Sequence, residues 1–225
     1  MNGRDETLRY HQEFYSRHAL DEPGTWLHKP SKLVLRALDQ LPEGPVTVYD
    51  LGAGVGRHTL PIAAAVPEGS RVIGVDFLPL ANEKLLQNAA EAGVEVEAVQ
   101  ADLEEFKLPA ETADLVVGIS ALEHVSNLEA FEDLLRRMQD GTKPGGLHCL
   151  EVFYDRYEIE MTGVVRPALV EFPLTGEELD DVINRLYASW TRIEEKRGTG
   201  TVEEARNGEP YKLMGSNLRL LARKP

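Results

Sequence analysis

The segment from Val46 to Gly56 constrains this chain more than any other, because it reads VTVYDLGAGVG. A β-branched apolar run ends in Asp50, and glycines follow at Gly52, Gly54 and Gly56. Such a run predicts a buried strand that leads through a tight turn into a helix. Glycine tolerates positive φ and leaves no side chain between the backbone of the turn and a ligand. The segment therefore predicts a loop that holds a nucleotide-type ligand against its backbone.

The spacing of these glycines departs from the dinucleotide-binding fingerprint G-x-G-x-x-G. That fingerprint requires a third glycine where this chain has Arg57, and it does not require an acid at the position of Asp50. A nicotinamide-dependent oxidoreductase is therefore the weaker interpretation of the loop, and it is kept as an alternative.

Length and charge limit the remaining possibilities. With 225 residues, of which 42% are hydrophobic and 28% charged, the chain can bury one core, and we expect a single domain over residues 1–225. A net charge of −14 argues against nucleic acid, because its phosphates require a basic surface. No apolar stretch has bilayer-spanning length, so we expect no membrane partner and a cytoplasmic location. No pattern predicts an oligomeric state.

The use of cysteine and histidine predicts neither a disulfide nor a metal site. Cys149 is the only cysteine, which excludes a disulfide within the chain, and no cysteine–histidine cluster has the spacing of zinc ligands. Because Cys149 lies in the apolar run LHCLEVF, we expect it to be a buried strand residue.

Short apolar runs alternate with helical patterns from residue 46 onward, which predicts β-α-β units and a parallel sheet. The expected strands lie near residues 46–51, 71–75, 94–99, 114–119, 147–153, 190–196 and 217–223. The expected helices lie near residues 55–66, 79–91, 127–139 and 175–188. In an open parallel sheet, ligands bind beyond the carboxyl ends of the strands. The informative residues are therefore those that follow each apolar run.

Two regions fall outside this alternation. Residues 1–44 combine helical spacing of apolar residues with an aromatic segment, and we expect an N-terminal helical lid there. Residues 154–174 are long for a connecting loop, which indicates a substrate-side insertion. A ligand-binding core over residues 45–153 and a C-terminal helix with strands over residues 175–225 complete the expected organisation.

The strand ends carry a recurring set of residues in order. Asp76 follows the second expected strand, Asp102 follows the third, SALEHV (120–125) follows the fourth, and the turn KPGG (143–146) precedes the fifth. Together with D-L-G-x-G-x-G, this set resembles the motifs of class I S-adenosylmethionine-dependent methyltransferases over residues 46–153. The resemblance implies a three-layer, Rossmann-like α/β fold. Its seven-stranded sheet would be mostly parallel, with an antiparallel last strand.

The resemblance implies S-adenosylmethionine as the cofactor. Asp76 can accept hydrogen bonds from both ribose hydroxyls, and Phe77 can pack on adenine. Asp102 resembles the family acid that accepts a hydrogen bond from the adenine amino group, beside the backbone amide of Leu103. The implied cofactor-binding residues are Asp50, Gly52, Ala53, Gly54, Asp76, Phe77, Asp102, Leu103, Ser120 and Glu123.

The segment Gly56-Arg57-His58-Thr59-Leu60 is also similar to the G-R-N-S-L segment of the tellurite-resistance methyltransferase-like group. This second resemblance is the weaker one, since His58 stands where that group has asparagine. No tellurite chemistry is carried over from it.

His124 is the candidate catalytic residue. It follows the fourth strand, near the expected position of the transferred methyl group, and imidazole titrates near neutral pH, which suits a general base. The alternative is that His124 caps the next segment or packs on the cofactor. The candidate substrate-binding residues are Tyr15, Trp26, Arg57, His58, Tyr154 and Arg156. For each of these, a structural role in the core, a surface ion pair or a loop is the alternative.

The sequence therefore predicts an enzyme that transfers a methyl group from S-adenosylmethionine to a small-molecule acceptor by in-line displacement. Positive charge already activates the leaving group, so we expect no metal. The alternatives are the oxidoreductase named above and a non-catalytic module that binds S-adenosylmethionine. No motif indicates which acceptor, or which of its atoms, receives the methyl group.

Overall fold

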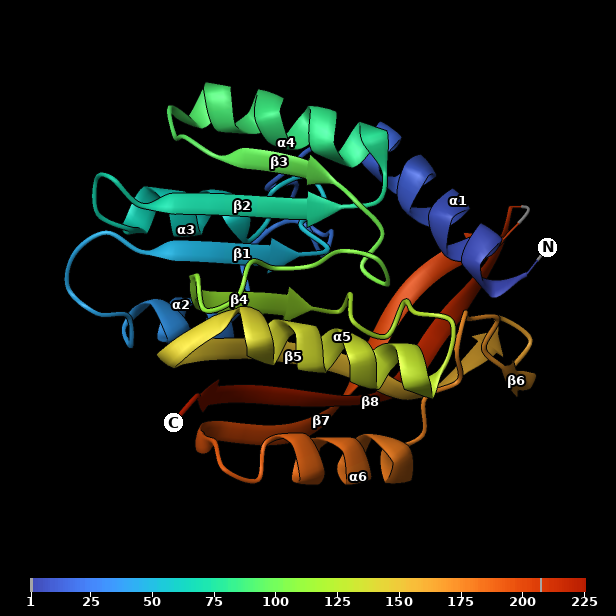
Figure 1. Ribbon diagram of the computed structural model, residues 1–225. Coiled ribbons are helices and arrows are strands. Elements are labelled where there is room, and N and C mark those ends of the chain that lie inside the picture. Colours follow the sequence, from blue (N-terminus) through green and yellow to red (C-terminus); the bar gives the residue numbers. More distant parts are fainter. Residues whose placement is uncertain (1, 207) are drawn as a thin grey trace.

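A mixed β-sheet forms the centre of the computed structural model, which describes residues 2–206 and 208–225 (Figure 1). The strand order is β3-β2-β1-β4-β5-β8-β7, and the short strand β6 pairs with β5 outside this path. β1 to β5 are parallel, whereas β8 runs antiparallel between β5 and β7. The strands are β1 (Thr47–Leu51), β2 (Arg71–Asp76), β3 (Glu97–Gln100), β4 (Ala113–Ile119), β5 (Thr142–Glu160), β6 (Val165–Pro167), β7 (Thr191–Arg206) and β8 (Glu209–Arg223).

Helices cover both faces of the sheet, which gives the fold three layers (Figure 1). α5 and α6 pack on one face, where Phe131 and Val182 enter the larger apolar core. α2 and α3 pack on the other face, where Val34 and Ile62 enter a second core. The helices are α1 (Gly3–Arg17), α2 (Lys32–Leu38), α3 (Thr59–Ala65), α4 (Pro79–Ala92), α5 (Leu128–Gly141) and α6 (Gly176–Leu186).

Helix α5 shows how the sequence specifies its own packing. Asn127 caps the helix, because its side-chain oxygen accepts a hydrogen bond from the backbone N–H of Ala130 at 3.0 Å. Phe131, Leu134 and Met138 repeat at helical spacing and are fully buried against the sheet. The predicted helix is confirmed, and it extends to Gly141.

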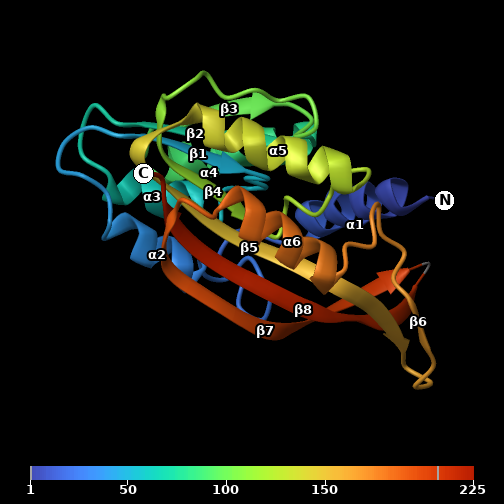
Figure 2. The same ribbon diagram turned by 60° about the horizontal axis from the view of Figure 1, so that its bottom comes forward.

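The predicted fold class is confirmed, with a mostly parallel sheet and an antiparallel last strand. The differences lie in β5, β7 and β8, which run past the predicted strand ends toward β6 (Figure 2). The sequence predicts a strand that ends at residue 153, whereas β5 continues to Glu160 because residues 157–160 pair with residues 211–214 of β8. Part of the predicted insertion over residues 154–174 is therefore strand.

The region predicted as a lid, residues 1–44, divides into two parts. α2 belongs to the core, since Leu33, Val34 and Ala37 are buried against the sheet. α1 instead crosses the carboxyl edge of the sheet, beside the extended ends of β7 and β8 (Figure 1). Arg206 of β7 donates from Nε to Oε1 of Glu6 at 2.9 Å, so an ion pair fastens α1 to the strands.

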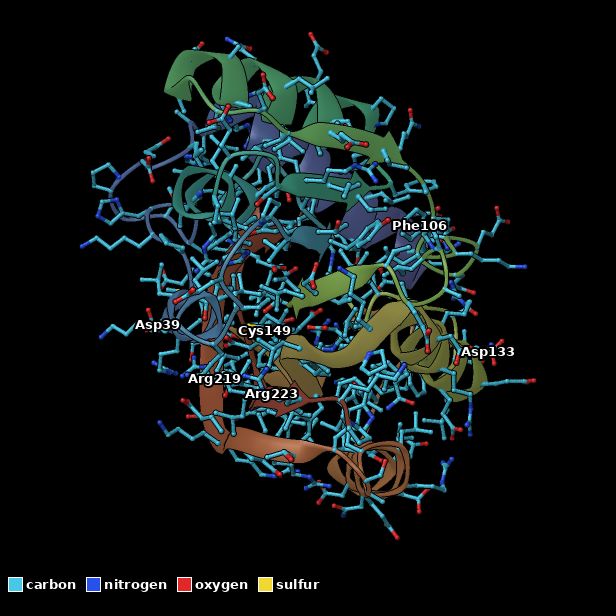
Figure 3. The ribbon with its side chains drawn as sticks, turned by 60° about the vertical axis from the view of Figure 1, so that its left-hand side comes forward. Asp39, Phe106, Asp133, Cys149, Arg219 and Arg223 are labelled. Carbon is cyan, nitrogen blue, oxygen red and sulfur yellow. The ribbon has the colours of Figure 1, made fainter. Side chains whose placement is uncertain are left out.

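His148, the buried histidine of β5, has a partner for each ring nitrogen. His148 contacts the hydroxyl of Thr142 at 2.9 Å and that of Tyr187 at 2.7 Å. Burial lowers the pKa of His148 to about 3, so the ring is neutral. The neighbouring Cys149 is buried as predicted, inside the layers of the fold (Figure 3). Burial raises the pKa of the Cys149 thiol far above its usual range, which keeps the thiol protonated and unreactive.

Candidate functional site

A cavity of about 290 Å³ lies at the carboxyl ends of β1, β2 and β4, and residues of α1 form one of its walls. Its lining includes these residues predicted to bind the cofactor: Gly52, Ala53, Gly54, Asp76, Phe77, Asp102, Leu103, Ser120 and Glu123. It also includes the predicted catalytic residue and most of the predicted substrate residues: His124, Tyr15, Trp26, Arg57, His58 and Arg156. Side chains spread over most of the sequence thus converge on one site.

Asp76 holds the glycine loop in place. Its Oδ2 accepts a hydrogen bond from the backbone N–H of Gly54 at 2.8 Å, and its Oδ1 accepts one from that of Leu78 at 2.9 Å. Burial raises the pKa of Asp76, although these two bonds oppose the shift. Gly54 has a φ of +54°, and a Cβ atom there would lie 2.6 Å from the Tyr15 hydroxyl. Glycine is therefore required at position 54 both by the backbone and by the close approach of α1.

Asp50 does not line the cavity, although the sequence predicts it as a cofactor contact. Its side chain is buried within β1, and its Oδ2 accepts a hydrogen bond from the Thr59 hydroxyl at 2.6 Å. Burial raises the pKa of Asp50 to about 6, against the opposing effect of the Thr59 bond. Asp50 therefore ties the glycine loop to the first residue of α3, and it acts on the cavity through the loop.

The structure contradicts the predicted substrate contact of Tyr154. Side chains alternate along β5, so Phe153 lines the cavity and Tyr154 packs in the larger apolar core. The Tyr154 hydroxyl accepts a hydrogen bond from Arg197 at 3.1 Å. Phe153 therefore takes the wall position that the sequence assigns to its neighbour.

Arg4 of α1 closes one end of the cavity. Its Nη2 lies 2.5 Å from Oδ2 of Asp102, and its guanidinium carbon lies 5.0 Å from the centre of the Phe77 ring. The hydrogen bond to Asp102 raises the pKa of Arg4, although burial opposes this shift. Arg4 therefore contacts both residues that the sequence predicts at the adenine end.

One face of α1 supplies three lining residues that the sequence does not predict, together with the predicted Tyr15. Arg4, Leu8, His11 and Tyr15 are spaced by four, three and four residues, so they share this face. The periodicity is present in the sequence, but a stripe of mixed polarity is not typical of a core-facing helix. The other lining residues without a prediction are Thr7, Tyr10, Leu27, Val55, Leu78, Ile119, Ala121, Phe153, Glu171, Val202, Glu204 and Leu213.

Two histidines and a glutamate meet in the wall. Nδ1 of His124 lies 3.2 Å from Oε2 of Glu171, and the ring centres of His124 and His11 are 5.8 Å apart. Burial alone would lower the pKa of His124, but the bond to Glu171 and the charges of Glu171 and Glu123 raise it overall. The same contact lowers the pKa of Glu171 to about 2 although burial opposes it. His124 and Glu171 therefore form an ion pair.

His11 is the neutral member of the cluster. Burial and the charge of His124 lower its pKa to about 4. Its Nδ1 lies 2.9 Å from the backbone oxygen of Thr7, and this oxygen can only accept, so Nδ1 carries the proton. Nε2 of the neutral ring is then unprotonated and carries a lone pair. His11 therefore presents a proton acceptor from the cavity wall at neutral pH.

Three lining side chains contain buried polar atoms that lack a hydrogen bond within the described part of the chain. These atoms are Oε2 of Glu123, Nε of Arg156 and Nε2 of His58. Other atoms of two of these groups are held: Oε1 of Glu123 accepts from the Phe153 N–H at 3.1 Å, and Nη2 of Arg156 donates to the backbone oxygen of Phe172 at 2.9 Å. Buried polar groups seldom stay unsatisfied, so these atoms mark positions where a ligand completes the bonding.

Neither a metal-ligand cluster nor a membrane-spanning helix is found in residues 2–206 and 208–225. This part of the chain holds no cluster of three or more histidine, cysteine, aspartate or glutamate side chains arranged to hold a metal ion. None of its helices is both long enough and apolar enough to cross a membrane.

Comparison with known proteins matches residues 48–146 to the family described as methyltransferase domain. The ubiquinone biosynthesis O-methyltransferase of Methylobacterium sp. strain 4-46 is 33% identical over 106 residues, which are 47% of this chain and 40% of that protein. The ribosomal protein L11 methyltransferase of Vibrio cholerae serotype O1 is 31% identical over 175 residues, which are 76% of this chain and 51% of that protein. The chain thus spans about half the length, or less, of these relatives.

Solved structures show the same fold. TehB from Haemophilus influenzae superimposes with a TM-score of 0.65 over 85% of this chain and 61% of that chain, at 19% sequence identity. The family match covers the strand-end motifs, and the structure brings these motifs to one cavity. Residues 48–146 therefore carry the match to the methyltransferase-domain family, which agrees with the resemblance to class I S-adenosylmethionine-dependent methyltransferases.

Proposed function

We propose that the chain is an enzyme that transfers a methyl group from S-adenosylmethionine to a small-molecule acceptor. The observation that carries this proposal is the position of Asp76. Its carboxylate fixes the glycine loop through Gly54 and lines the same cavity as Asp102 and Glu123. A strand-end acid beside a glycine loop is where the fold places a ribose.

The residues of the cavity fit this cofactor. Asp76 has lone pairs left for the ribose hydroxyls after its two backbone bonds, because a carboxylate offers about four acceptor positions. Phe77, Asp102 and the backbone amide of Leu103 lie at one end, as a purine requires. The unpartnered Oε2 of Glu123 would accept a bond from the ammonium group of the methionine part.

Methyl transfer depends on the alignment of the acceptor with the methyl group of the cofactor. The bound cofactor supplies a methyl group on a positively charged sulfur. This charge makes the sulfur a good leaving group, because it departs as a neutral thioether. The chain holds the acceptor in line with the methyl group and keeps water out, and α1 serves both purposes because six of its residues line the cavity. Neither a covalent intermediate on the protein nor a metal ion is part of this proposal.

An acceptor that carries a proton on its reacting atom also needs a base. The sequence predicts His124 for this role, but the contact with Glu171 raises the pKa of His124 and favours its protonated form, which is not a base. We assign the role instead to Nε2 of His11, whose ring is neutral because its pKa is lowered to about 4. His124 then acts as a charged neighbour that holds the pKa of His11 low.

The acceptor is proposed to be a small molecule because the cavity of about 290 Å³ is walled by α1. The net charge of −14 disfavours nucleic acid. One curated relative is named as an enzyme of ubiquinone biosynthesis and another as a methyltransferase of a ribosomal protein. The first name is the one that agrees with a small-molecule acceptor.

Isothermal titration of the purified chain with S-adenosylhomocysteine tests this function. We expect one binding site, no binding of NADH, and release of S-adenosylhomocysteine when the chain is incubated with S-adenosylmethionine and a metabolite mixture. A folded protein that does not bind S-adenosylhomocysteine would end the proposal. Binding of NADH would favour the oxidoreductase, and cofactor binding without turnover would favour the non-catalytic module.

Replacing Arg4 by methionine is expected to tighten S-adenosylhomocysteine binding by about fivefold, the factor that corresponds to one partly exposed ion pair. Arg4 contacts Asp102 and Phe77, the two residues that adenine would contact. Binding of the cofactor must therefore displace the Arg4 side chain. Arg9→Met is the matched control, since Arg9 is ion-paired to Glu6 on the same helix but does not line the cavity. Weaker binding by Arg4→Met would show that Arg4 contacts the bound cofactor instead.

A further inference from the structure

A second cavity adjoins the first on the α2 side of the sheet. Its volume is about 370 Å³, and Arg57, Ile119 and Ser120 line both cavities. Figure 3 shows the side of the sheet concerned: Arg219 on β8 lies on the side where Asp39 follows α2, away from Asp133 on α5. Besides Arg57, the charged residues that line the second cavity are Lys32, Arg36, Lys196, Arg219, Glu151 and Glu194.

The two carboxylates of this cavity are already neutralised. Oε1 of Glu194 lies 2.7 Å from Nη2 of Arg36 and 3.1 Å from Nζ of Lys196. Oε1 of Glu151 lies 3.0 Å from Nη2 of Arg219. The glutamate side chains are only 13–14% exposed, whereas the three cationic side chains are 42–65% exposed. The acids therefore form the floor, and the cationic groups face the opening.

Positive charge is left over after this pairing. Within the described part of the chain, Lys32 and Arg57 have no carboxylate within 4.0 Å, and Nε of Arg36 is buried without a hydrogen-bond partner. Five cationic side chains against two carboxylates leave a local excess of three positive charges (5 − 2) in a chain of net charge −14. Such an excess in a hollow attracts a small anion and binds it through charge-assisted hydrogen bonds.

Ser120 connects the two cavities. It is exposed just after β4, and its φ is +51°. Its backbone N–H donates to the backbone oxygen of Glu151 at 2.7 Å. A positive φ is uncommon for serine, and the fold maintains it where both cavities share a wall. A ligand that spans the two cavities would pass this residue.

We propose that the second cavity is an anion subsite, which binds the carboxylate or phosphate group of an anionic methyl acceptor. The nucleophilic atom of that acceptor extends past Ser120 into the first cavity. This inference rests on the proposed methyl transfer and adds the chemical class of the acceptor to it. The anion is fixed by Lys32, Lys196 and Arg219 at the opening, and Arg57 lies at the boundary with the cofactor.

Three small probes test the subsite on the protein loaded with S-adenosylhomocysteine: benzoate, phenyl phosphate and the neutral benzamide. By calorimetry, we expect at least one of the two anions to bind about fivefold or more tightly than benzamide, the factor of one partly exposed charge contact. Which anion binds more tightly distinguishes a carboxylate from a phosphate ligand. Raising the salt concentration should weaken the binding of the two anions and leave the binding of benzamide unchanged. Benzamide binding equal to that of both anions would overturn the subsite.

Charge-removing variants locate the binding. Lys32→Met and Lys196→Met should each weaken binding of the preferred anion by about fivefold. Lys212→Met should not, because Lys212 is an exposed residue of β8 outside both cavities. S-adenosylhomocysteine affinity should stay the same in all three variants. If Lys196→Met weakens the binding of S-adenosylhomocysteine instead, the second cavity holds the carboxylate of the cofactor and the inference is wrong. Anion binding that depends on both lysines in a protein without affinity for S-adenosylhomocysteine would preserve the subsite and refute the proposed function.

Discussion

Asp76→Ala is expected to weaken S-adenosylhomocysteine binding by about 1.5–3 kcal/mol, which corresponds to about 10- to 150-fold in affinity. Two losses combine in this variant. The ribose hydroxyls lose a charged acceptor, and the backbone N–H groups of Gly54 and Leu78 lose the carboxylate that holds them at 2.8 and 2.9 Å. The loop would then sample conformations that no longer match the ligand.

Asp114→Ala is the matched control for this variant. Asp114 is also the carboxylate of a residue near a strand terminus. Its Oδ2 accepts hydrogen bonds from the backbone N–H of Thr47 at 2.8 Å and from Nζ of Lys143 at 2.7 Å. It lies at the start of β4, at the opposite edge of the sheet from the cavity. Calorimetry should show normal affinity in Asp114→Ala, with thermal unfolding measured for both proteins. Normal affinity in Asp76→Ala would remove Asp76 from the site.

The parallel half of the fold is predictable because its signals are local. A glycine loop follows the first strand, Pro79 begins α4, Gly93 ends it in a left-handed conformation, and Asn127 caps α5. Each of these signals acts within a few residues, so the element boundaries agree to within a few positions. The resemblance to a family then supplies the antiparallel direction of the last strand, which local patterns alone do not determine.

The extended ends of β5, β7 and β8 are not predictable in the same way. Their pairing joins residues 157–160 to residues 211–214 and residues 197–206 to residues 209–218, so each strand depends on the others. The segment TRIEEKRGTGTVEEAR of β7 is rich in charge, and charged residues are depleted in strands. Cross-strand partners such as Glu158 and Arg206 stabilise this region, and the sequence does not reveal which partners meet.

The same distinction holds within the candidate site. Strand-end acids can be located because parallel strands end at one edge, which is why Asp76 and Asp102 line the cavity. The directions of Asp50 and Tyr154 depend on side-chain alternation within buried strands, and the expected strand boundaries do not resolve it. Glu171, which lies 47 residues from its partner His124, follows only from the tertiary fold.

Helix α1 connects the two halves of the site. Arg4 contacts Asp102 at the adenine end, and Tyr15 approaches Gly54 of the glycine loop. His11 lies between them on the same helical face, beside His124. Any displacement of α1 therefore changes the cofactor end and the proton acceptor together. Closure over the cofactor would place His11 for the reaction only when the cofactor is in position.

His11→Phe is expected to lower the turnover number by about 10²- to 10⁴-fold for an acceptor that must lose a proton, which is the usual contribution of a general base. Phenylalanine keeps the ring contacts with Tyr15 and Trp26 but has no Nε2 lone pair. S-adenosylhomocysteine affinity should therefore change little. His18→Phe is the matched control, because His18 lies just after α1 and outside the cavity. Turnover is measured as S-adenosylhomocysteine release with the acceptor found in the metabolite mixture.

Two further measurements separate a base from a packing residue. Added imidazole should restore part of the activity of His11→Ala, since it can enter the space left by the side chain. The neutral form of His11 is the active one, so the rate should fall as the pH drops through the pKa of His11, about 4. Because the charge of His124 lowers that pKa, His124→Gln should raise it and move the acidic limb of the rate profile to higher pH. NMR titration of the histidine rings gives the same shift directly, with the distant His148 as the internal reference. An acidic limb that does not move in His124→Gln, together with normal turnover in His11→Phe, would show that neither histidine governs the proton.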